Sequence, residues 1–301
     1  MDYNVLRRRD FAGGLTDEAL KIRIQDDLAR DGWTLLRGFQ PDMAGFAGLV
    51  GRLCRRVTFD PARSHSTDKT QMVDAGLGPI GLHIENGNTP RCPDIVCFFA
   101  ERAAFEGSQT TICDGVRVWD RFDPARKARW NQPMTVERVL PELLWKRYLA
   151  NEHPAISSPD EVTMEHVLQF QQAVPGQAFE LHDDGSLTYR LTVAPVRASV
   201  FGGGQSGFAN AVLGPSHNYQ PPRYRLADGS ELSARQLREE LPELHGRTKG
   251  VPGSRWSVAD LPFAPRLLTL LGAEHLIVRA HSEGHWRTSR PLWTLTGTWL
   301  G

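Results

Sequence analysis

The chain has 301 residues, of which 40% are hydrophobic and 23% are charged, so it is large enough for a sizeable core and is not disordered. Its 35 Lys and Arg residues balance its 35 Asp and Glu residues, which gives no reason to expect a nucleic acid or an anionic membrane as a partner. The N-terminus lacks the apolar run of a secretory signal, no segment is apolar enough to span a bilayer, and the four cysteines form no Cys-x-x-Cys pair. These features indicate a soluble cytoplasmic protein with reduced thiols.

The first part of the chain, residues 1–119, combines predicted helices and strands. Thr16 is a suitable N-cap for a helix whose apolar residues end before Gly32. The elements expected after this helix are a strand at 33–39, a helix at 43–55, and strands at 79–85, 95–100 and 109–113. The segment 95–100 is wholly apolar, so we expect a strand that is buried on both faces.

Residues 120–185 differ in character, because they combine tryptophans, prolines and a helical stretch at 161–174 without an evident strand alternation. This predicts an insertion of mixed helix and loop that acts as a lid. The elements expected in residues 186–301 are strands at 186–193, 197–201, 208–213, 274–280 and 291–300, and helices at 233–241 and 261–271. Two strand-rich blocks that flank an insertion predict a single domain over residues 1–301, mainly β with helices packed outside.

The most informative stretch is Gly81-Leu82-His83-Ile84-Glu85-Asn86-Gly87-Asn88, which lies at the end of the predicted strand 79–85. A strand places alternate side chains on one face, so His83 and Glu85 should project together. An imidazole and a carboxylate side by side supply two of the three ligands of a 2-His-1-carboxylate iron site. The third ligand must then be a histidine that is distant in sequence. His285 is the favoured candidate, and His275 and His281 are alternatives near the same predicted strand.

Several segments occur in an order that is seen in one superfamily. They are His83-Ile84-Glu85, the Pro90-x-x-Pro93-Asp94 turn, the apolar strand after it, Glu106-Gly107-Ser108-Gln109-Thr110-Thr111 and His285-x-Arg287-Thr288. Over roughly residues 30–115 and 265–301, the chain resembles the Fe(II)/2-oxoglutarate-dependent oxygenases of the taurine dioxygenase and clavaminate synthase-like type. The resemblance implies a double-stranded β-helix (jelly-roll) core, with the insertion as its lid.

The resemblance also implies roles for individual residues. His83, Glu85 and His285 would hold Fe(II), and Thr110 would help to bind a carboxylate of 2-oxoglutarate. The family places an arginine for the distal carboxylate on the last strand, but residues 293–299 contain none here. Arg290 is expected to take this role, because a shortened connection can bring its bidentate guanidinium to the site. The alternatives are that another arginine binds this carboxylate, or that 2-oxoglutarate is not the co-substrate.

The activity implied by the resemblance couples the oxidative decarboxylation of 2-oxoglutarate by O2 to the oxidation of a small molecule. Hydroxylation, desaturation or epoxidation of a small polar metabolite is expected. Glu85 at the carboxylate position is similar to the clavaminate synthase-like branch, which often acts on amino acids and their derivatives. Two other interpretations remain: a jelly-roll iron oxygenase that does not use 2-oxoglutarate, and a non-catalytic metal-binding jelly-roll domain.

Overall fold

The structure is a computed structural model that describes most of the chain. The described residues are 5–11, 16–37, 39, 42–58, 60, 63, 70–73, 80–90, 92–100, 110–153, 155–201, 203–214, 220–241, 244, 267–272, 275–279 and 292–299. The description covers the backbone alone at residues 10, 72, 73, 80, 81, 100 and 110–112, and in all the segments from 267 onward.

The largest sheet has seven strands, in the order β1-β2-β14-β6-β16-β3, with β4 paired to β16. These strands are β1 (Val5–Arg7), β2 (Trp33–Arg37), β3 (Cys54–Thr58), β4 (Gln71–Val73), β6 (Ile95–Ala100), β14 (Leu267–Gly272) and β16 (Leu292–Trp299). The β1–β2 pair is parallel and the other pairs are antiparallel. The C-terminal strands β14 and β16 therefore flank β6, which comes from the first third of the chain.

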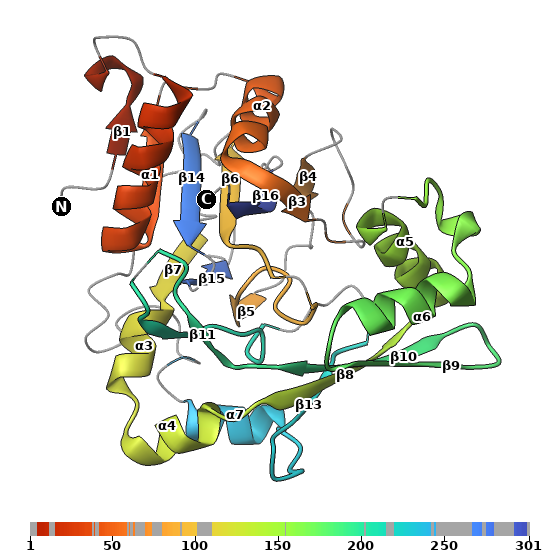
Figure 1. Ribbon diagram of the computed structural model, residues 1–301. Helices are drawn as coiled ribbons and strands as arrows, with labels where there is room; N and C mark the ends of the chain where they lie inside the picture. Colours follow the sequence, from red (N-terminus) through yellow and green to blue (C-terminus); the bar gives the residue numbers. More distant parts are fainter. Residues whose placement is uncertain are drawn as a thin grey trace, which may run out of the picture.

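Two helices, α1 (Asp17–Asp31) and α2 (Met43–Leu53), lie against this sheet (Figure 1). The Thr16 hydroxyl accepts a hydrogen bond from the amide of Ala19, and Gly32 ends α1 in the left-handed conformation at φ 75°, as the sequence predicts. Ile95, Cys97 and Phe99 of β6 pack in one core cluster with these helices. The intervening residues Val96 and Phe98 are also buried, which confirms the prediction that β6 is covered on both faces.

The predicted helix at 261–271 is wrong from Leu267 onward, because this segment forms β14 between β2 and β6. Residues 261–266 lie outside the described part. The segment Leu267-Leu268-Thr269-Leu270-Leu271 is almost entirely apolar, so its pattern does not distinguish a buried helix from a buried strand. Hydrogen bonding to strands on both sides overrides the helix propensity of leucine here.

A second, four-stranded antiparallel sheet has the order β13-β8-β10-β9. Its strands are β8 (Met134–Leu140), β9 (Gln177–Leu181), β10 (Leu187–Val193) and β13 (Arg223–Arg225). Strands β8 and β9 lie within the predicted insertion, so the expectation that residues 120–185 contain only helix and loop is wrong. The alternation in β8 is hard to recognise because its buried side continues from Met134 and Val136 to Arg138, which is only 6% exposed.

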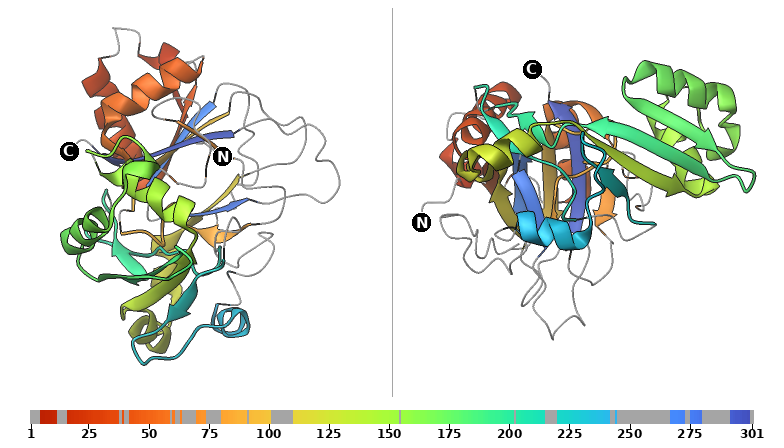
Figure 2. Two further views of the ribbon diagram at one scale, coloured as in Figure 1. Left: turned by 90° about the vertical axis from the view of Figure 1, so that its right-hand side faces the viewer. Right: turned by 90° about the horizontal axis from the view of Figure 1, so that it is seen from below.

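The remaining α-helices that the structure describes follow β7 (Thr110–Asp114) in the chain. They are α3 (Gly115–Arg121), α4 (Pro124–Trp130), α5 (Glu142–Glu152), α6 (Met164–Ala173) and α7 (Ala234–Glu240). In the right-hand view of Figure 2, α5 and α6 project to one side of the molecule together with the end of the four-stranded sheet. Among the described residues, no helix has the length and apolar character needed to cross a membrane.

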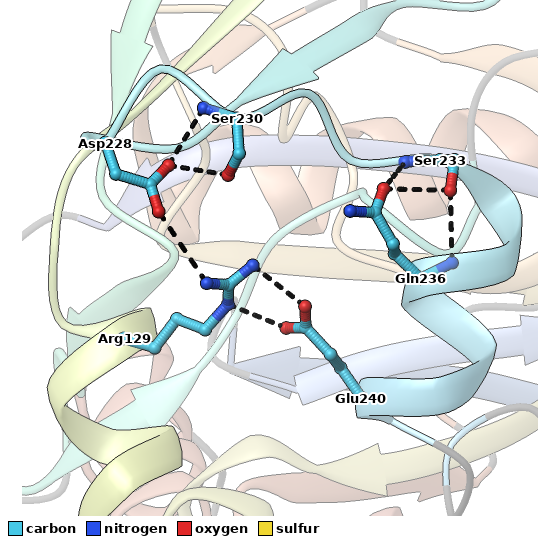
Figure 3. A network of polar contacts seen from close by, with 6 residues as sticks. All are labelled: Arg129, Asp228, Ser230, Ser233, Gln236 and Glu240. Carbon is cyan, nitrogen blue, oxygen red and sulfur yellow. Dashed lines mark hydrogen bonds and ion pairs between the residues drawn. The ribbon is translucent and has the colours of Figure 1, made fainter.

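Helices α4 and α7 are joined by a polar network (Figure 3). Arg129 of α4 donates from Nε and Nη2 to the two carboxylate oxygens of Glu240 at 3.0 and 2.9 Å. Its Nη1 also lies 3.8 Å from a carboxylate oxygen of Asp228. The Ser233 hydroxyl begins α7 by accepting from the amide of Gln236, as predicted for a helix at 233–241.

The described residues also form two small sheets. The three-stranded sheet has the order β5-β15-β7, and the two-stranded sheet pairs β11 with β12. The strands are β5 (Ile80–His83), β7 (Thr110–Asp114), β11 (Val196–Ala198), β12 (Ser206–Phe208) and β15 (His275–Arg279). The predicted strand at 208–213 is wrong, because the chain turns after Phe208. The Asn210 side chain accepts from the amide of Val212 and donates to the carbonyl of Pro195, so it stabilises a turn instead.

Candidate metal centre

The predicted ligands His83 and Glu85 lie at the end of β5. His83 is the last residue of the strand and pairs with Ile277 of β15. The amide of Ile84 then donates to the carbonyl of Asn210 at 3.2 Å, so Glu85 begins a turn at 85–88 instead of continuing the strand. The expectation that β5 extends through residue 85 is therefore wrong. Even so, His83 Nε2 and Glu85 Oε1 are 3.9 Å apart.

The turn at 85–88 is held by neighbouring segments. Asn86 has a positive φ of 53°, a conformation that asparagine tolerates better than most residues. The Asn88 side chain donates to Tyr224 Oη at 3.0 Å, and the same hydroxyl donates to the carbonyl of Ala211 at 2.9 Å. Leu82, beside His83, belongs to the core cluster that also includes residues of the four-stranded sheet. The predicted ligands thus stand on a backbone that is fixed from several sides.

A third ionisable side chain, that of Arg63, contacts Glu85, and sequence reasoning did not find it. Its Nη2 donates to Glu85 Oε2 at 3.0 Å and to Oε1 at 3.3 Å, and the two side chains are only 9% and 8% exposed. Arg63 lies between β3 and β4, and its Nε is 3.5 Å from Asp60 Oδ2. The only local sign of its role is the Asp60-x-x-Arg63 spacing, which is common in surface turns and carries no specific signal.

Two opposing effects act on the pKa of Glu85. Burial is the largest single effect and raises this pKa, because it disfavours the charged carboxylate. The charges and hydrogen bonds of Arg63 and His83 act in the opposite direction and together outweigh burial. The pKa of Glu85 is therefore held below its usual range, and the carboxylate is ionised at neutral pH, which is the form that binds a metal.

The other predicted site residues are described only in part or not at all. Thr110 is the first residue of β7, and its backbone pairs with Arg279 of β15. His275, an alternative ligand, begins β15 and pairs with Asp114. The backbones of His83, Thr110 and His275 thus share the three-stranded sheet, but the side chains of the latter two are outside the description. His281, His285 and Arg290 also lie outside the described residues.

The donor set fits a divalent iron site as far as it is described. Two cis ligands of an octahedral ion, each about 2.0–2.2 Å from it, lie about 3 Å apart, so the 3.9 Å separation of His83 Nε2 and Glu85 Oε1 must close by about 1 Å, within reach of a side-chain rotation, for them to share a metal. Burial raises the pKa of Cys54 and of Cys113 to about 12, so neither thiol is ionised at neutral pH. In the described part of the chain, no three His, Cys, Asp or Glu side chains form a group that could hold a metal. A third protein ligand would have to come from the remaining residues.

Comparison with solved structures shows related folds. A Burkholderia xenovorans protein described as an alpha-ketoglutarate dependent 2,4-D dioxygenase has a TM-score of 0.53 and 14% identity, with 97% of this chain and 91% of that chain covered. The PvcB protein of Pseudomonas aeruginosa has a TM-score of 0.53 and 13% identity, with 95% and 81% covered. AAD-2, solved in complex with Mn(II) and N-oxalylglycine, has a TM-score of 0.54 and 12% identity, with 98% and 94% covered. No curated protein matches the sequence. At this identity, the likeness establishes a common fold.

A family model that matches two thirds of the chain, together with this fold, defines a non-haem iron oxygenase. The chain belongs to the taurine catabolism dioxygenase TauD, TfdA family, whose family model matches residues 9–212. It is accordingly an Fe(II)- and 2-oxoglutarate-dependent dioxygenase, as the sequence predicts. The match includes His83, Glu85 and Thr110, and it ends before His285 and Arg290.

Proposed function

We propose that His83, Glu85 and His285 hold the Fe(II) in a jelly-roll core formed by the seven-stranded and three-stranded sheets. The observation that carries this proposal is the 3.9 Å contact between His83 Nε2 and Glu85 Oε1 at the end of β5. Ligands that occupy one face of an octahedral ion leave the opposite face for 2-oxoglutarate and O2. The bound metal and co-substrate supply the oxidising power, and the protein supplies the geometry and a site from which water is excluded.

The protein's own contribution at this site is to fix the ligands before the metal binds. Glu85 is ionised and buried, and its turn is held by Tyr224 through Asn88. His83 is held by the pairing of β5 with β15. Because these groups do not have to be ordered when the metal enters, little conformational entropy is lost on binding.

Thr110 and Arg290 are the residues we propose for 2-oxoglutarate. Thr110 begins β7, in the same small sheet as His83, and a threonine hydroxyl can donate a hydrogen bond to one carboxylate of the co-substrate. The last strand β16 carries no arginine, and Arg290 precedes it by two residues. Thr110→Val should weaken 2-oxoglutarate binding by about 0.5–1.5 kcal/mol, the net value of one hydrogen bond. Arg290→Ala should cost more, because a charge-assisted bidentate pair is about twice as strong; an unchanged affinity would exclude Arg290 from the site.

The substrate we propose is a small polar metabolite such as an amino acid derivative, which the enzyme hydroxylates, desaturates or epoxidises. Residues 120–185 would serve as the lid over the metal. The supporting observation is that Trp130, Trp145 and Phe170 share a core cluster with Leu82 and Ile84, the neighbours of the two ligands. A lid in this position can hold a substrate carbon near the metal and exclude water.

The experiment is aerobic conversion of 2-oxoglutarate to succinate by the iron-loaded protein, with and without small polar substrates. His83→Ala and Glu85→Ala should abolish succinate formation without unfolding the protein. Glu18→Ala, which removes an exposed carboxylate from α1, is the matched control and should retain full activity. Full succinate formation by His83→Ala or Glu85→Ala would contradict our proposal.

A further inference from the structure

The backbone near Arg63, whose side chain contacts Glu85, is held by a buried glutamine. Gln71, at the start of β4, is 4% exposed, and its side-chain amide makes two hydrogen bonds with the backbone of Asp60. Its Oε1 accepts from the amide of Asp60 at 2.8 Å, and its Nε2 donates to the carbonyl of Asp60 at 2.8 Å. The amide of Arg63 in turn donates to the same carbonyl at 3.1 Å. The backbone from which the Arg63 side chain extends is therefore fixed to β4.

A second link joins the end of β3 to the same turn. The Asn86 side chain donates to the Thr58 hydroxyl at 3.4 Å. Arg63 and the end of β3 thus both contact the turn at 85–88, Arg63 through Glu85 and Thr58 through Asn86. The side chains of Gln71, Arg63 and Glu85 are all at least nine-tenths buried. Buried polar groups that satisfy one another in this way restrict each other to one arrangement.

The charges in this network favour a metal on Glu85. A guanidinium next to a ligand carboxylate reduces the attraction of that carboxylate for a cation. Here Asp60 Oδ2 lies 3.5 Å from Arg63 Nε, so the Asp60 carboxylate balances the positive charge of Arg63. Glu85 therefore retains its negative charge for the metal. The guanidinium contacts both carboxylate oxygens through one nitrogen, so it limits the rotation of the carboxylate while leaving room for a further bond to each oxygen.

We propose that Arg63 is a positioning residue that orients the Glu85 carboxylate for the metal. The hydrogen bonds between Gln71 and the backbone of Asp60 hold Arg63 in place for this role. This inference rests on the proposed role of Glu85 as a ligand. Outer residues that hydrogen-bond to a ligand typically change metal affinity by about 10–100-fold when they are replaced. Lysine keeps the positive charge of Arg63 but lacks its planar guanidinium group, so Arg63→Lys should retain only part of the wild-type metal affinity.

The experiment is titration of the metal-free protein with Mn(II), with Co(II) as a second probe whose absorption spectrum reports the ligand geometry. We expect Arg63→Met to weaken Mn(II) binding by about 10–100-fold and to alter the Co(II) spectrum. Arg63→Lys should fall between Arg63→Met and the wild type. Gln71→Leu keeps Arg63 and removes only its support, so it should show a smaller loss. This variant and Arg63→Lys test the proposal even if Arg63→Met does not fold.

Arg129→Met is the matched control. It removes an arginine that makes a two-pronged contact with Glu240 in the network between α4 and α7 (Figure 3), and it should bind Mn(II) as the wild type does. A folded Arg63→Met variant that binds Mn(II) within threefold of the wild type, or an Arg63→Lys variant that binds it at least as tightly as the wild type, would overturn the positioning role alone. If Glu85→Ala binds as tightly as the wild type, the proposed metal site is itself wrong, and the positioning role is wrong with it.

Discussion

Gly87 lies in the turn that carries Glu85, and the structure leaves no room there for a side chain. A Cβ at this position would lie 2.6 Å from Ile84 Cγ1 and 3.1 Å from Ala211 Cβ. Ile84 is 3% exposed and Ala211 is 4% exposed, so neither can move aside into solvent. Inserting a methyl group into such a packed position typically costs about 1–3 kcal/mol. We therefore expect Gly87→Ala to destabilise the protein by this amount and to displace the turn.

Gly48, in the middle of α2, provides a control with the opposite expected sign. The nearest atom to a Cβ there is Arg52 Nη1 at 3.5 Å, which is an ordinary contact with the end of a flexible side chain. Glycine inside a helix is about 0.5–1 kcal/mol less favourable than alanine, because it loses more backbone freedom on folding. Gly48→Ala should therefore stabilise the protein by up to about 1 kcal/mol.

Urea unfolding of the two variants beside the wild type measures both changes. Mn(II) titration of Gly87→Ala would add a functional readout, since a displaced turn should bind the metal less tightly. If Gly87→Ala were as stable as the wild type, the close packing of Ile84 and Ala211 on this turn would be wrong. A loss of stability in Gly48→Ala would instead show that α2 is packed more tightly at this point than the structure indicates.

Two further predictions concern the four-stranded sheet and the proposed lid. The ion pair with Arg190 holds the pKa of Glu137 below its usual value. The contribution of this ion pair to stability is therefore complete above about pH 4.3, the usual pKa of glutamate, and is lost as the pH falls. The difference in unfolding free energy between the wild type and Glu137→Gln should therefore shrink on acidification, and a difference that grew would contradict this pair. In the metal-free protein, amide hydrogens at 142–173 should exchange faster than those at 95–100, and substrate binding should slow them. Equal protection of the two segments in the absence of ligands would show that α5 and α6 are rigid scaffold.

The closeness of the His83 and Glu85 side chains could be predicted from sequence because it is local. His83 and Glu85 are two residues apart, so an extended backbone or a nearby turn brings the two side chains together in either case. The strand itself was predicted too long, since the hydrogen bond from Ile84 to Asn210 depends on a segment that is distant in sequence. Arg63 could not be found for the same reason. Its contact with Glu85 joins residues that are 22 positions apart, and no periodic pattern encodes such a contact.

The fold shows the same division between local and distant causes. The caps of α1 are encoded by Thr16 and Gly32, each of which acts within a few residues, and the sequence predicts both correctly. In contrast, β14 is a strand because β2 and β6 offer it hydrogen-bonding partners on both sides. Within β8, the buried Arg138 interrupts the apolar alternation that would have revealed a strand. Sequence patterns thus fail where a distant partner decides the conformation.

The identity of the third metal ligand is the most direct test of the account. Electron paramagnetic resonance of added Mn(II), which separates bound from free ion, can be applied to His285→Ala, to His275→Ala and to the wild type. We predict one bound Mn(II) in the wild type and in His275→Ala, and a loss of high-affinity binding in His285→Ala. If His285→Ala retained the bound ion and His275→Ala lost it, the proposed triad of His83, Glu85 and His285 would be wrong.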